Sequence, residues 1–349
     1  MRRRELLVAS PALFALAACE GRAQPAIARP GPLPALKAAA PFPVGAAVRA
    51  DAFADPAYVA ALTRHFDQVT ADWQMKMEVI LRRDGSLSFD RSDQIADFAR
   101  AHGLRLFGHT LIWHQQEPAA FERLADDRAA FTRAYAEYVR AVAGRYRHAV
   151  GWDVVNEPFS WNGEERTGGI WERVLGPDYI RIAFEHAQEA APDAVLFLND
   201  YNLEHFPRKR AAFLRLAEGL LKAGAPLGGL GTQTHLNLET DPRSIAPALR
   251  DLAGLGLPVH VSELDLKLGD SADDPEAHEA QAHLVGTVAE AFAALPAAQR
   301  FAITTWGVRD RDHWRRHRRD EAGPPDRPLL LDDAGAPKPA FRAAVHAWR

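Results

Sequence analysis

Two short segments each place a glutamate beside side chains that could assist it in catalysis. Glu157 ends the run Trp-Asp-Val-Val-Asn-Glu, and Glu263 lies in Val-His-Val-Ser-Glu-Leu-Asp. Two carboxyl groups that flank a reacting bond can act as proton donor and as nucleophile or base, which is what cleavage of a glycosidic bond needs. A separation of about 5–5.5 Å leads to retention of configuration and one of about 6.5–9.5 Å to inversion, and the sequence leaves this choice open.

Further side chains that could take part in catalysis or binding lie at or just past the ends of similar apolar runs. They are Asp72, His109, Trp113, His114, Asn156, Asn199, Asp200, Gln233, His235, Asp265 and Trp306. A single residue of this kind is more often a solvated, capping or core side chain than a functional one. Their shared position at the ends of runs instead predicts one common site.

The apolar runs must therefore be arranged so that their ends meet. Eight of them read as strands: Val44–Val48, Gln68–Asp72, Arg105–Trp113, Gly151–Glu157, Ala194–Asp200, Leu230–His235, Val259–Asp265 and Phe301–Val308. Amphipathic segments between them are predicted as helices, among them Asp127–Tyr146, Asp178–Ala190, Arg208–Ala223, Ser244–Leu252 and Glu276–Ala294. This alternation predicts an α/β fold, a (β/α)8 TIM barrel in a single catalytic domain, whose loops converge at the C-terminal ends of the strands.

The composition excludes several classes of protein. With 47% hydrophobic and 25% charged residues, the 349-residue chain is typical of a soluble globular protein. Its 42 Lys and Arg against 46 Asp and Glu give a formal charge of −4, so we expect no nucleic-acid partner. A single cysteine, Cys19, excludes an intramolecular disulfide framework and a multi-thiolate metal site.

The N-terminal segment predicts export. Arginines at positions 2 to 4 precede an apolar run that reaches residue 18 and is too short to span a bilayer, so residues 1–18 are predicted to be a signal peptide. The arginines also resemble a twin-arginine signal. Leu-Ala-Ala directly before Cys19 resembles a bacterial lipobox, which predicts lipid attachment at that cysteine. A plain cleaved signal with an incidental cysteine is the alternative.

The segment after Cys19 is rich in proline and alanine and shows no hydrophobic period. We predict a tether over residues 19–43 and the catalytic domain over residues 44–349. The protein is then expected to be extracytoplasmic, in the periplasm or at the cell surface, and to reach a membrane only through the lipid anchor.

Taken together, several motifs resemble glycoside hydrolase family 10, the endo-β-1,4-xylanase family. In chain order they are Met75-Lys76, Gly108–His114, Trp152–Glu157, Asn199–Asn202, Gly231–His235, Ser262–Asp265, Trp306–Val308, Pro328–Asp332 and Lys338-Pro339. The resemblance covers nearly the whole body of the chain. It implies retaining hydrolysis of β-1,4-xylosidic linkages in xylan or xylo-oligosaccharides by a two-glutamate double displacement, performed by a monomer without cofactor or metal.

The resemblance also implies individual roles. Glu157 would be the acid/base and Glu263 the nucleophile, Asn156 would hold the 2-hydroxyl of the sugar, and His235 would hydrogen-bond Glu263 and be oriented by Asp265. The implied substrate-binding residues are Lys76, His109, Trp113, Asn156, Gln233, His235, Trp306 and Trp314. Of these, Lys76, His109 and Trp113 would line the glycone side. The implied supporting residues are Asp72, Trp73, His114, Asp200 and Asp265.

The chain departs from the family pattern in three places. Asp72 and Trp73 stand where the family usually has Glu and Asn, which normally hydrogen-bond the second glycone sugar, so an altered glycone subsite is expected. Pro158 replaces the usual alanine after the acid/base, and we expect it to be tolerated. The loop at 309–320 is strongly basic and is either a solvated loop or a contact for acidic decorations such as glucuronyl groups.

Three other functions are open on sequence alone. One is a related β-glycan hydrolase that acts on glucuronoxylan or β-glucan. Another is a non-catalytic, glycan-binding surface lipoprotein, which we would expect to have lost one of the two carboxylates. A metal-dependent hydrolase could use His109, His114, His235 and Asp200, but their spacing is unlike that of a metal site, and chelators would distinguish it.

Overall fold

Parallel strands form the centre of the molecule. The computed structural model describes residues 33–166, 168–317 and 325–349, so the expected export signal, Cys19 and the first part of the expected tether lie outside the described residues. The strands are β1 (Val44–Val48), β2 (Gln68–Ala71), β3 (Arg105–Trp113), β4 (Gly151–Asn156), β5 (Val195–Asp200), β6 (Gly229–Thr232), β7 (His235–Asn237), β8 (Val259–Lys267) and β9 (Arg300–Thr305).

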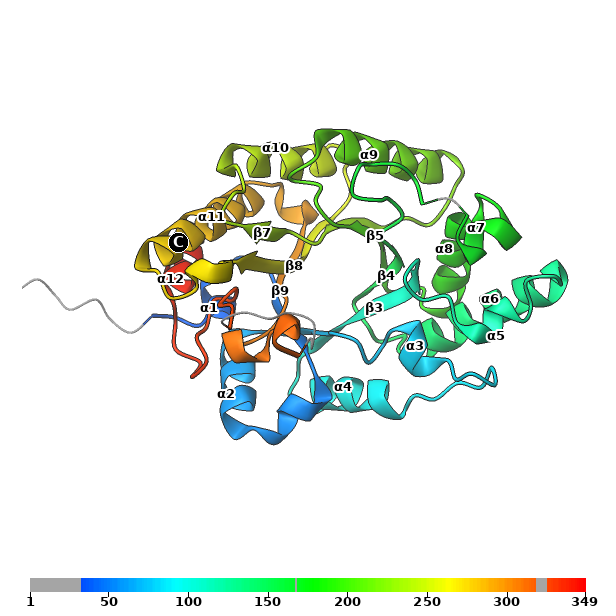
Figure 1. Cartoon of the computed structure of the whole chain (residues 1–349), viewed down its shortest axis with the longest axis horizontal. Helices are drawn as coiled ribbons and strands as arrows, with labels where there is room; N and C mark the ends of the chain where they lie inside the picture. The colour runs from blue at the N-terminus through cyan, green and yellow to red at the C-terminus, as the bar shows by residue number, and fades with distance from the viewer. Residues whose placement is uncertain (1–32, 167, 318–324) are drawn as a thin grey trace, which may run out of the picture. The chain divides into compact units, whose positions relative to one another are not determined.

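Eight of these strands close into a barrel. Strands β1 to β6 pair in chain order, β6 then pairs with β8, β8 with β9, and β9 returns to β1 with Val44 opposite Ile303. All of these pairings are parallel, and helices surround the ring (Figure 1). The predicted (β/α)8 barrel is therefore confirmed.

The sixth predicted strand, Leu230–His235, is wrong in its second half. Strand β6 ends at Thr232, and the short β7 begins at His235 and pairs with the outer part of β8. The chain turns between them because Thr234 has a left-handed backbone with φ of 58°. Its hydroxyl donates to Glu204 at 2.8 Å, which holds the turn that presents His235.

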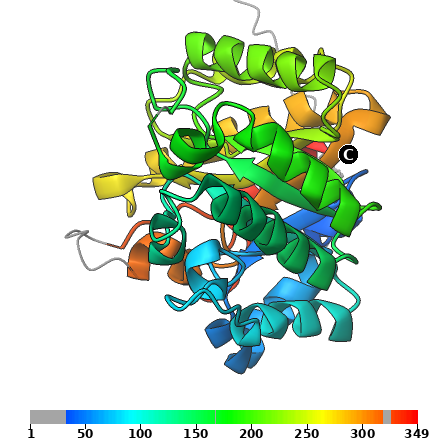
Figure 2. The ribbon, with the colours of Figure 1, turned by 90° about the vertical axis from the view of Figure 1, so that its right-hand side faces the viewer.

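Long helices cover the outside of the barrel. They are α2 (Pro56–His65), α4 (Asp90–Ala101), α6 (Arg128–Arg145), α8 (Tyr179–Ala190), α9 (Pro207–Lys222), α10 (Pro242–Ala253), α11 (Pro275–Ala293) and α12 (Pro339–Ala347). Shorter helices are α1 (Leu36–Ala39), α3 (Met77–Ile80), α5 (Ala119–Glu122) and α7 (Ile170–Leu175). In Figure 1, α9 and α10 lie on the opposite side of the barrel from α2 and α4, and Figure 2 shows α6 beside α8.

Local sequence explains where several of these helices begin. The carboxylates of Asp55, Asp127, Asp241 and Asp274 each accept a backbone N–H from the first turn of α2, α6, α10 and α11. Proline occupies the first helical position of α2, α10 and α11, where its missing N–H costs nothing. These starts fix where each loop ends on its return from the C-terminal end of a strand.

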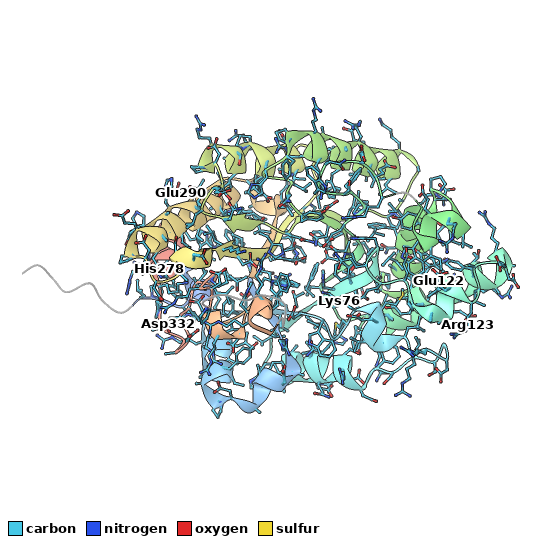
Figure 3. The ribbon with its side chains drawn as sticks, viewed as in Figure 1. Lys76, Glu122, Arg123, His278, Glu290 and Asp332 are labelled. Carbon is cyan, nitrogen blue, oxygen red and sulfur yellow. The ribbon has the colours of Figure 1, made fainter. Side chains whose placement is uncertain are left out.

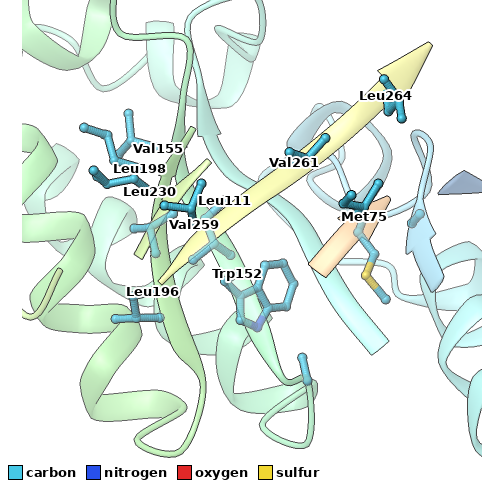
Figure 4. Close-up of a cluster of buried hydrophobic side chains, with 14 of the residues drawn as sticks. Met75, Leu111, Trp152, Val155, Leu196, Leu198, Leu230, Val259, Val261 and Leu264 are labelled. Carbon is cyan, nitrogen blue, oxygen red and sulfur yellow. The ribbon is translucent and has the colours of Figure 1, made fainter. Parts of the chain in front are cut away.

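Apolar side chains pack the barrel wall against the helices. The cluster in Figure 4 includes Trp152, Leu196, Leu230 and Val259 from neighbouring strands, all buried. Trp152 lies directly over Gly108 of β3, where an added Cβ would come within 2.2 Å of the indole. This close approach requires glycine at position 108 and helps to hold β4, which ends next to Glu157.

The expected tether is wrong for residues 33–43. Leu36 in α1 is fully buried, and the ring centre of Phe42 lies 4.8 Å from that of Phe292 and 5.4 Å from that of Trp348. These apolar side chains find partners on α11 and beside α12, so the segment belongs to the folded domain. In the ranges that the structure describes, no helix is long and apolar enough to cross a membrane.

Candidate active site

The two candidate glutamates lie on facing parts of the barrel. Glu157 directly follows β4 and has a left-handed φ of 56°, which is uncommon for a residue with a side chain, and its N–H donates to the carbonyl of Asn199 at 2.8 Å. Glu263 lies within β8 and is 4% exposed. The backbone of neighbouring strand β5 therefore holds the strained conformation at Glu157.

Three amide side chains connect the two carboxyl groups. Gln233 Nε2 donates to Glu157 Oε1 at 3.0 Å and to Asn156 Oδ1 at 3.3 Å. Asn199 Nδ2 donates to the same Asn156 oxygen at 2.9 Å and to Glu263 Oε1 at 3.1 Å. Both glutamates thus belong to one hydrogen-bond network, which fixes their positions relative to each other.

A second set of contacts runs outward from Glu263. His235 Nε2 lies 3.2 Å from Glu263 Oε2, and His235 Nδ1 lies 3.0 Å from Asp265 Oδ1. The other oxygen of Asp265 lies 2.8 Å from Nε2 of the buried His313, in the loop after β9. The sequence predicts both contacts of His235, but it assigns no role to His313.

These contacts determine the charges beside the nucleophile candidate. Burial opposes protonation of His235, but the flanking carboxylates, Asp265 foremost, raise its pKa to about 10. Burial raises the pKa of Glu263, and the hydrogen bond and charge of His235 counteract that shift. Burial would also raise the pKa of Asp265, but His235 and the hydrogen bond from His313 hold it well below its usual range. At neutral pH His235 is therefore an imidazolium that favours an ionised Glu263.

The residues assigned to the glycone side lie on the loops of β2 and on β3. Lys76 Nζ lies 4.7 Å from the ring centre of Trp113, and Figure 3 shows Lys76 near the centre of the molecule. His109 Nδ1 lies 2.7 Å from Asp153 Oδ2, and both side chains are buried. Burial, together with the charge of Lys76, lowers the pKa of His109, and burial raises the pKa of Asp153. These opposite shifts favour the uncharged form of each side chain.

The surroundings of Glu157 differ from those of Glu263. His114 Nδ1 lies 3.9 Å from Glu157 Oε2, and burial lowers the pKa of His114 to about 4, so this imidazole is neutral at pH 7. Arg166 Nε donates to the backbone carbonyl of Glu157 at 3.1 Å, and Arg166 Nη2 donates to the Tyr201 hydroxyl at 2.9 Å. The Arg166 guanidinium is thus bound to a backbone carbonyl and to the Tyr201 hydroxyl, and no imidazolium faces the Glu157 carboxyl group.

Asp200 lies behind Glu157. Asp200 Oδ1 lies 2.7 Å from Nζ of Lys209 in α9, and both side chains are fully buried. Asp200 Oδ2 accepts the N–H of Phe159 at 3.1 Å, which places Asp200 beneath the loop after β4. Asp200 therefore contacts the backbone of this loop, and the supporting role in catalysis expected for it stays a prediction.

Asp72 and Trp306 lie beside one cavity. They line a cavity of about 340 Å³ together with Arg49, Arg309 and Arg311. Arg309 is engaged there, because its guanidinium lies 2.8 Å from the carboxylate of Asp55. The cavity separates the loops that follow β1, β2 and β9.

Two further predicted residues, Trp73 and Trp314, lie against neighbouring side chains. The guanidinium carbon of Arg91 lies 5.0 Å from the ring centre of Trp73. Trp314 begins the short helix Trp314–His317, and its ring centre lies 5.9 Å from that of His313. In the basic loop, Arg316 lies 3.1 Å from the carboxylate of Asp333, and residues 318–320 lie outside the described ranges. The substrate-binding roles of both indoles stay predictions.

The four residues weighed as metal ligands do not converge on one point. His109, His114 and His235 each lie beside different carboxylates, and Asp200 is paired with Lys209. Across the described ranges, no group of three or more His, Cys, Asp or Glu side chains has a geometry that could hold a metal ion.

Sequence reasoning missed several residues of this site. The strand-end position of Asn199 predicts its place in the common site but not its link between Asn156 and Glu263, and Tyr201, in the same motif, is not predicted. His313 directly precedes Trp314, but nothing in the sequence indicates its contact with Asp265. Lys209 stands between two arginines and reads as a solvated surface residue, although it is fully buried.

Comparisons with known proteins agree on one family. A sequence profile described as Glycosyl hydrolase family 10 matches residues 35–347. Endo-1,4-beta-xylanase A of Thermoanaerobacterium saccharolyticum is 35% identical over 320 residues, which are 87% of this chain and 27% of that protein. Exoglucanase XynX of Acetivibrio thermocellus is 34% identical over 318 residues, which are 86% of this chain and 28% of that protein. The chain therefore spans less than a third of the length of these two relatives.

A solved structure extends the agreement to the fold. It is a glutamate-to-alanine variant of the intracellular xylanase of Thermoanaerobacterium saccharolyticum in complex with xylotetraose. Its TM-score with this chain is 0.81 at 32% identity, and the match covers 89% of this chain and 98% of that one. With a profile match over nearly all described residues and a shared barrel, this chain belongs to glycosyl hydrolase family 10.

Proposed function

We propose that the chain is a retaining glycoside hydrolase that cleaves β-1,4-xylosidic linkages in xylan or xylo-oligosaccharides. The observation that carries this proposal is the amide network between Glu157 and Glu263, whose two ends have different electrostatic surroundings. A double displacement needs two carboxyl groups of opposite protonation state, and an imidazolium stands beside one of them and not beside the other.

In the first step, Glu157 gives its proton to the glycosidic oxygen while a carboxylate oxygen of Glu263 attacks the anomeric carbon. The bond from that carbon to the leaving oxygen breaks, a glycosyl ester forms on Glu263, and the aglycone leaves as an alcohol. Asn156 lies between the two glutamates, where it can hold the 2-hydroxyl of the reacting sugar. A hydrogen bond that strengthens as the ring flattens contributes to the rate.

In the second step, the Glu157 carboxylate takes a proton from water, and the water oxygen attacks the same carbon. The ester bond breaks, Glu263 returns as a carboxylate, and Glu157 is protonated again. His235 remains an imidazolium through both steps because Asp265 stays ionised on its far side. It therefore stabilises the departing carboxylate of Glu263 in the second step.

The choice of xylan over another β-glycan rests on the comparisons. The first relative is called an endo-1,4-beta-xylanase and the solved structure holds xylotetraose, whereas the second relative is called an exoglucanase. The xylanase names of the first relative and of the solved structure, together with the bound xylotetraose, favour a xylan-type substrate, and β-glucan is the second candidate. Product analysis on xylan, glucuronoxylan and mixed-linkage glucan separates these substrates.

The roles of the two glutamates can be tested with an aryl β-xylobioside and with xylan. We expect Glu263→Ala to abolish activity on both and to regain turnover with azide, giving a glycosyl azide of inverted configuration. We expect Glu157→Ala to keep activity on an aryl glycoside with a good leaving group, which needs no proton, and to lose activity on xylan. Proton NMR of the first-formed anomer in the wild-type reaction should show retention.

Glu122→Ala is a matched control, because Glu122 lies in α5 with an exposed ion pair to Arg173 at 3.2 Å. It should leave both activities unchanged. Full xylan activity in either Glu157→Ala or Glu263→Ala, or an inverted anomer from the wild type, contradicts the assignment.

We also propose that the chain is exported and attached to a membrane through a lipid on Cys19. The lipobox-like Leu-Ala-Ala before this cysteine and the preceding arginines support the proposal. A clickable palmitate analogue fed to expressing bacteria should label the wild type but not Cys19→Ala. Equal labelling of both proteins would contradict lipid attachment at this residue.

A further inference from the structure

Two large aromatic side chains are exposed next to the candidate active site. Trp161 is 67% exposed and Phe206 is 39% exposed, with ring centres 6.5 Å apart and ring planes at 70°. Tryptophan is highly buried on average, so an indole exposed to this extent calls for a ligand or a partner. In the described part of the chain, Leu221 is the other large hydrophobic residue in the exposed class.

Both aromatic residues lie at the end of the barrel that carries the glutamates. Trp161 belongs to the loop between β4 and α7, which begins with Glu157. Phe206 follows β5 and directly precedes α9. Loops that leave the C-terminal ends of barrel strands converge on one face, so both residues belong to loops on the face that carries the two glutamates.

The loop that carries Trp161 is held in place. Phe159 and Glu165 form an antiparallel bridge, and the N–H of Ser160 donates to the carbonyl of Glu164 at 2.9 Å. Gly163 packs so closely on α9 that an added Cβ would lie 2.8 Å from Cα of Lys209. A loop whose backbone is fixed before binding loses little conformational freedom when a ligand packs on its side chain.

The position of the pair along the barrel indicates which part of a substrate it would meet. Lys76 and Trp113, assigned to the glycone side, follow or end β2 and β3, whereas the ring pair follows β4 and β5, beyond Glu157 in strand order. Trp161 is four residues from Glu157, so their Cα atoms are at most about 14 Å apart. The acid/base faces the leaving group, and the aglycone must extend on its side of the cleaved bond.

We propose that Trp161 and Phe206 form a binding platform for the aglycone part of a β-linked glycan chain, a few sugar units beyond the cleaved bond. The inference rests on the proposed function, because it takes Glu157 as the acid that protonates the leaving group. A pyranose ring has an apolar face of C–H bonds that matches the face of an indole. Binding energy gained there holds a polymer in register for cleavage without touching the reacting sugar.

The test compares a long substrate with one that has no aglycone sugars. In Trp161→Ala we expect KM for xylan and for xylohexaose to rise about threefold to tenfold, because one aromatic contact is lost. Activity on an aryl β-xylobioside should stay within twofold of the wild type, because its leaving group does not reach the platform. Xylohexaose labelled at the reducing end should shift toward cuts with fewer aglycone sugars, and Trp161→Tyr should restore most of the KM.

Leu221→Ala is the matched control, since Leu221 is an exposed apolar residue near the far end of α9. It should change none of these readouts.

Equal loss on xylan and on the aryl glycoside would mean that Trp161 supports the fold or the acid/base loop, and unchanged KM on both long substrates would also overturn the platform. A change in oligomeric state of Trp161→Ala, with unchanged KM, would assign the rings to a protein contact instead. An inactive wild type on the aryl glycoside would overturn the proposed function itself, which is a separate outcome.

Discussion

Lys209 Nζ lies 2.7 Å from Asp200 Oδ1, and neither side chain has any exposure to solvent. The pair supports the loop after β4 from below: Asp200 accepts the N–H of Phe159, and Lys209 Nζ lies 3.4 Å from the carbonyl of the same residue. Burial raises the pKa of Asp200 to about 7 and lowers that of Lys209, so the charged pair is stable only because each ion has the other. The conformation of Glu157 depends on this contact through Pro158 and Phe159.

Breaking the pair should weaken both the fold and catalysis. Lys209→Met leaves a buried carboxylate without its cation, and we expect the free energy of unfolding at pH 8 to fall by about 3–5 kcal/mol. Urea unfolding measures the loss, and kcat on xylan should fall with it. The double variant Asp200→Asn, Lys209→Met should recover part of the stability, because no charge is left unpaired.

Lys222→Met provides the control for that experiment. Lys222 lies at the exposed end of the same helix, 3.9 Å from Glu218, and exposed pairs of this kind contribute about 0.3–0.5 kcal/mol. A Lys209→Met protein as stable as Lys222→Met would show that the buried pair does not support the loop.

The raised pKa of His235 predicts a loss of stability in alkaline solution. Its pKa is about 10 in the folded protein and about 6.5 in an unfolded chain. The folded state therefore binds the proton more tightly, and this contribution is fully present below about pH 6.5 and is lost as pH rises toward 10. Melting temperatures of the wild type should fall more steeply over this range than those of His235→Gln. Parallel curves for the two proteins would contradict the assigned charge.

His313 is expected to act on the nucleophile through Asp265 and His235. Removing its hydrogen bond should raise the pKa of Asp265 and free this carboxylate to turn away from His235, and the loss of that contact would reduce the pKa of His235. In His313→Ala we expect kcat on an aryl β-xylobioside to fall several-fold with little change in KM. NMR titration of the His235 ring should show a lower pKa, a change that a merely structural role would not produce. His313→Gln keeps a donor and should restore part of both.

Gly108→Ala should destabilise the barrel wall. Its Cβ would lie 2.2 Å from the Trp152 indole, and because the ring is fully buried we expect a cost of about 1–3 kcal/mol or more in unfolding free energy. Gly219→Ala is the matched control, since it lies in α9 with nothing within 4 Å of its new Cβ, and it should be neutral or stabilising. Equal stability of the two variants would contradict the close packing at Gly108.

Patterns that repeat along the chain allowed most of the fold to be predicted. Buried parallel strands give continuous apolar runs, and the stripe of Phe131, Tyr135, Tyr138 and Val142 lies on the buried face of α6 as its spacing predicts. The ends of those runs also indicated the positions of the two glutamates. Periodicity carries this information because each element buries a regular face.

Contacts between distant segments left no such pattern. The break at Thr234 depends on a hydroxyl that finds Glu204, and the burial of Phe42 depends on Phe292 and Trp348 near the other end of the chain. Lys209 is buried because the loop after β4 folds over α9. Each of these features is decided by a tertiary partner, which a single sequence does not display.

The pairing of β1 with β9 bears on how the molecule is made. Val44 has its partner at Ile303, so a growing polypeptide emerging from the ribosome exposes one unpaired edge of β1 until β9 has been synthesised. Closure over such a large sequence separation is slow and leaves backbone donors and acceptors available to other chains. Chaperones that cover this strand edge during translation would raise the yield of native enzyme. A chain truncated before β9 would aggregate.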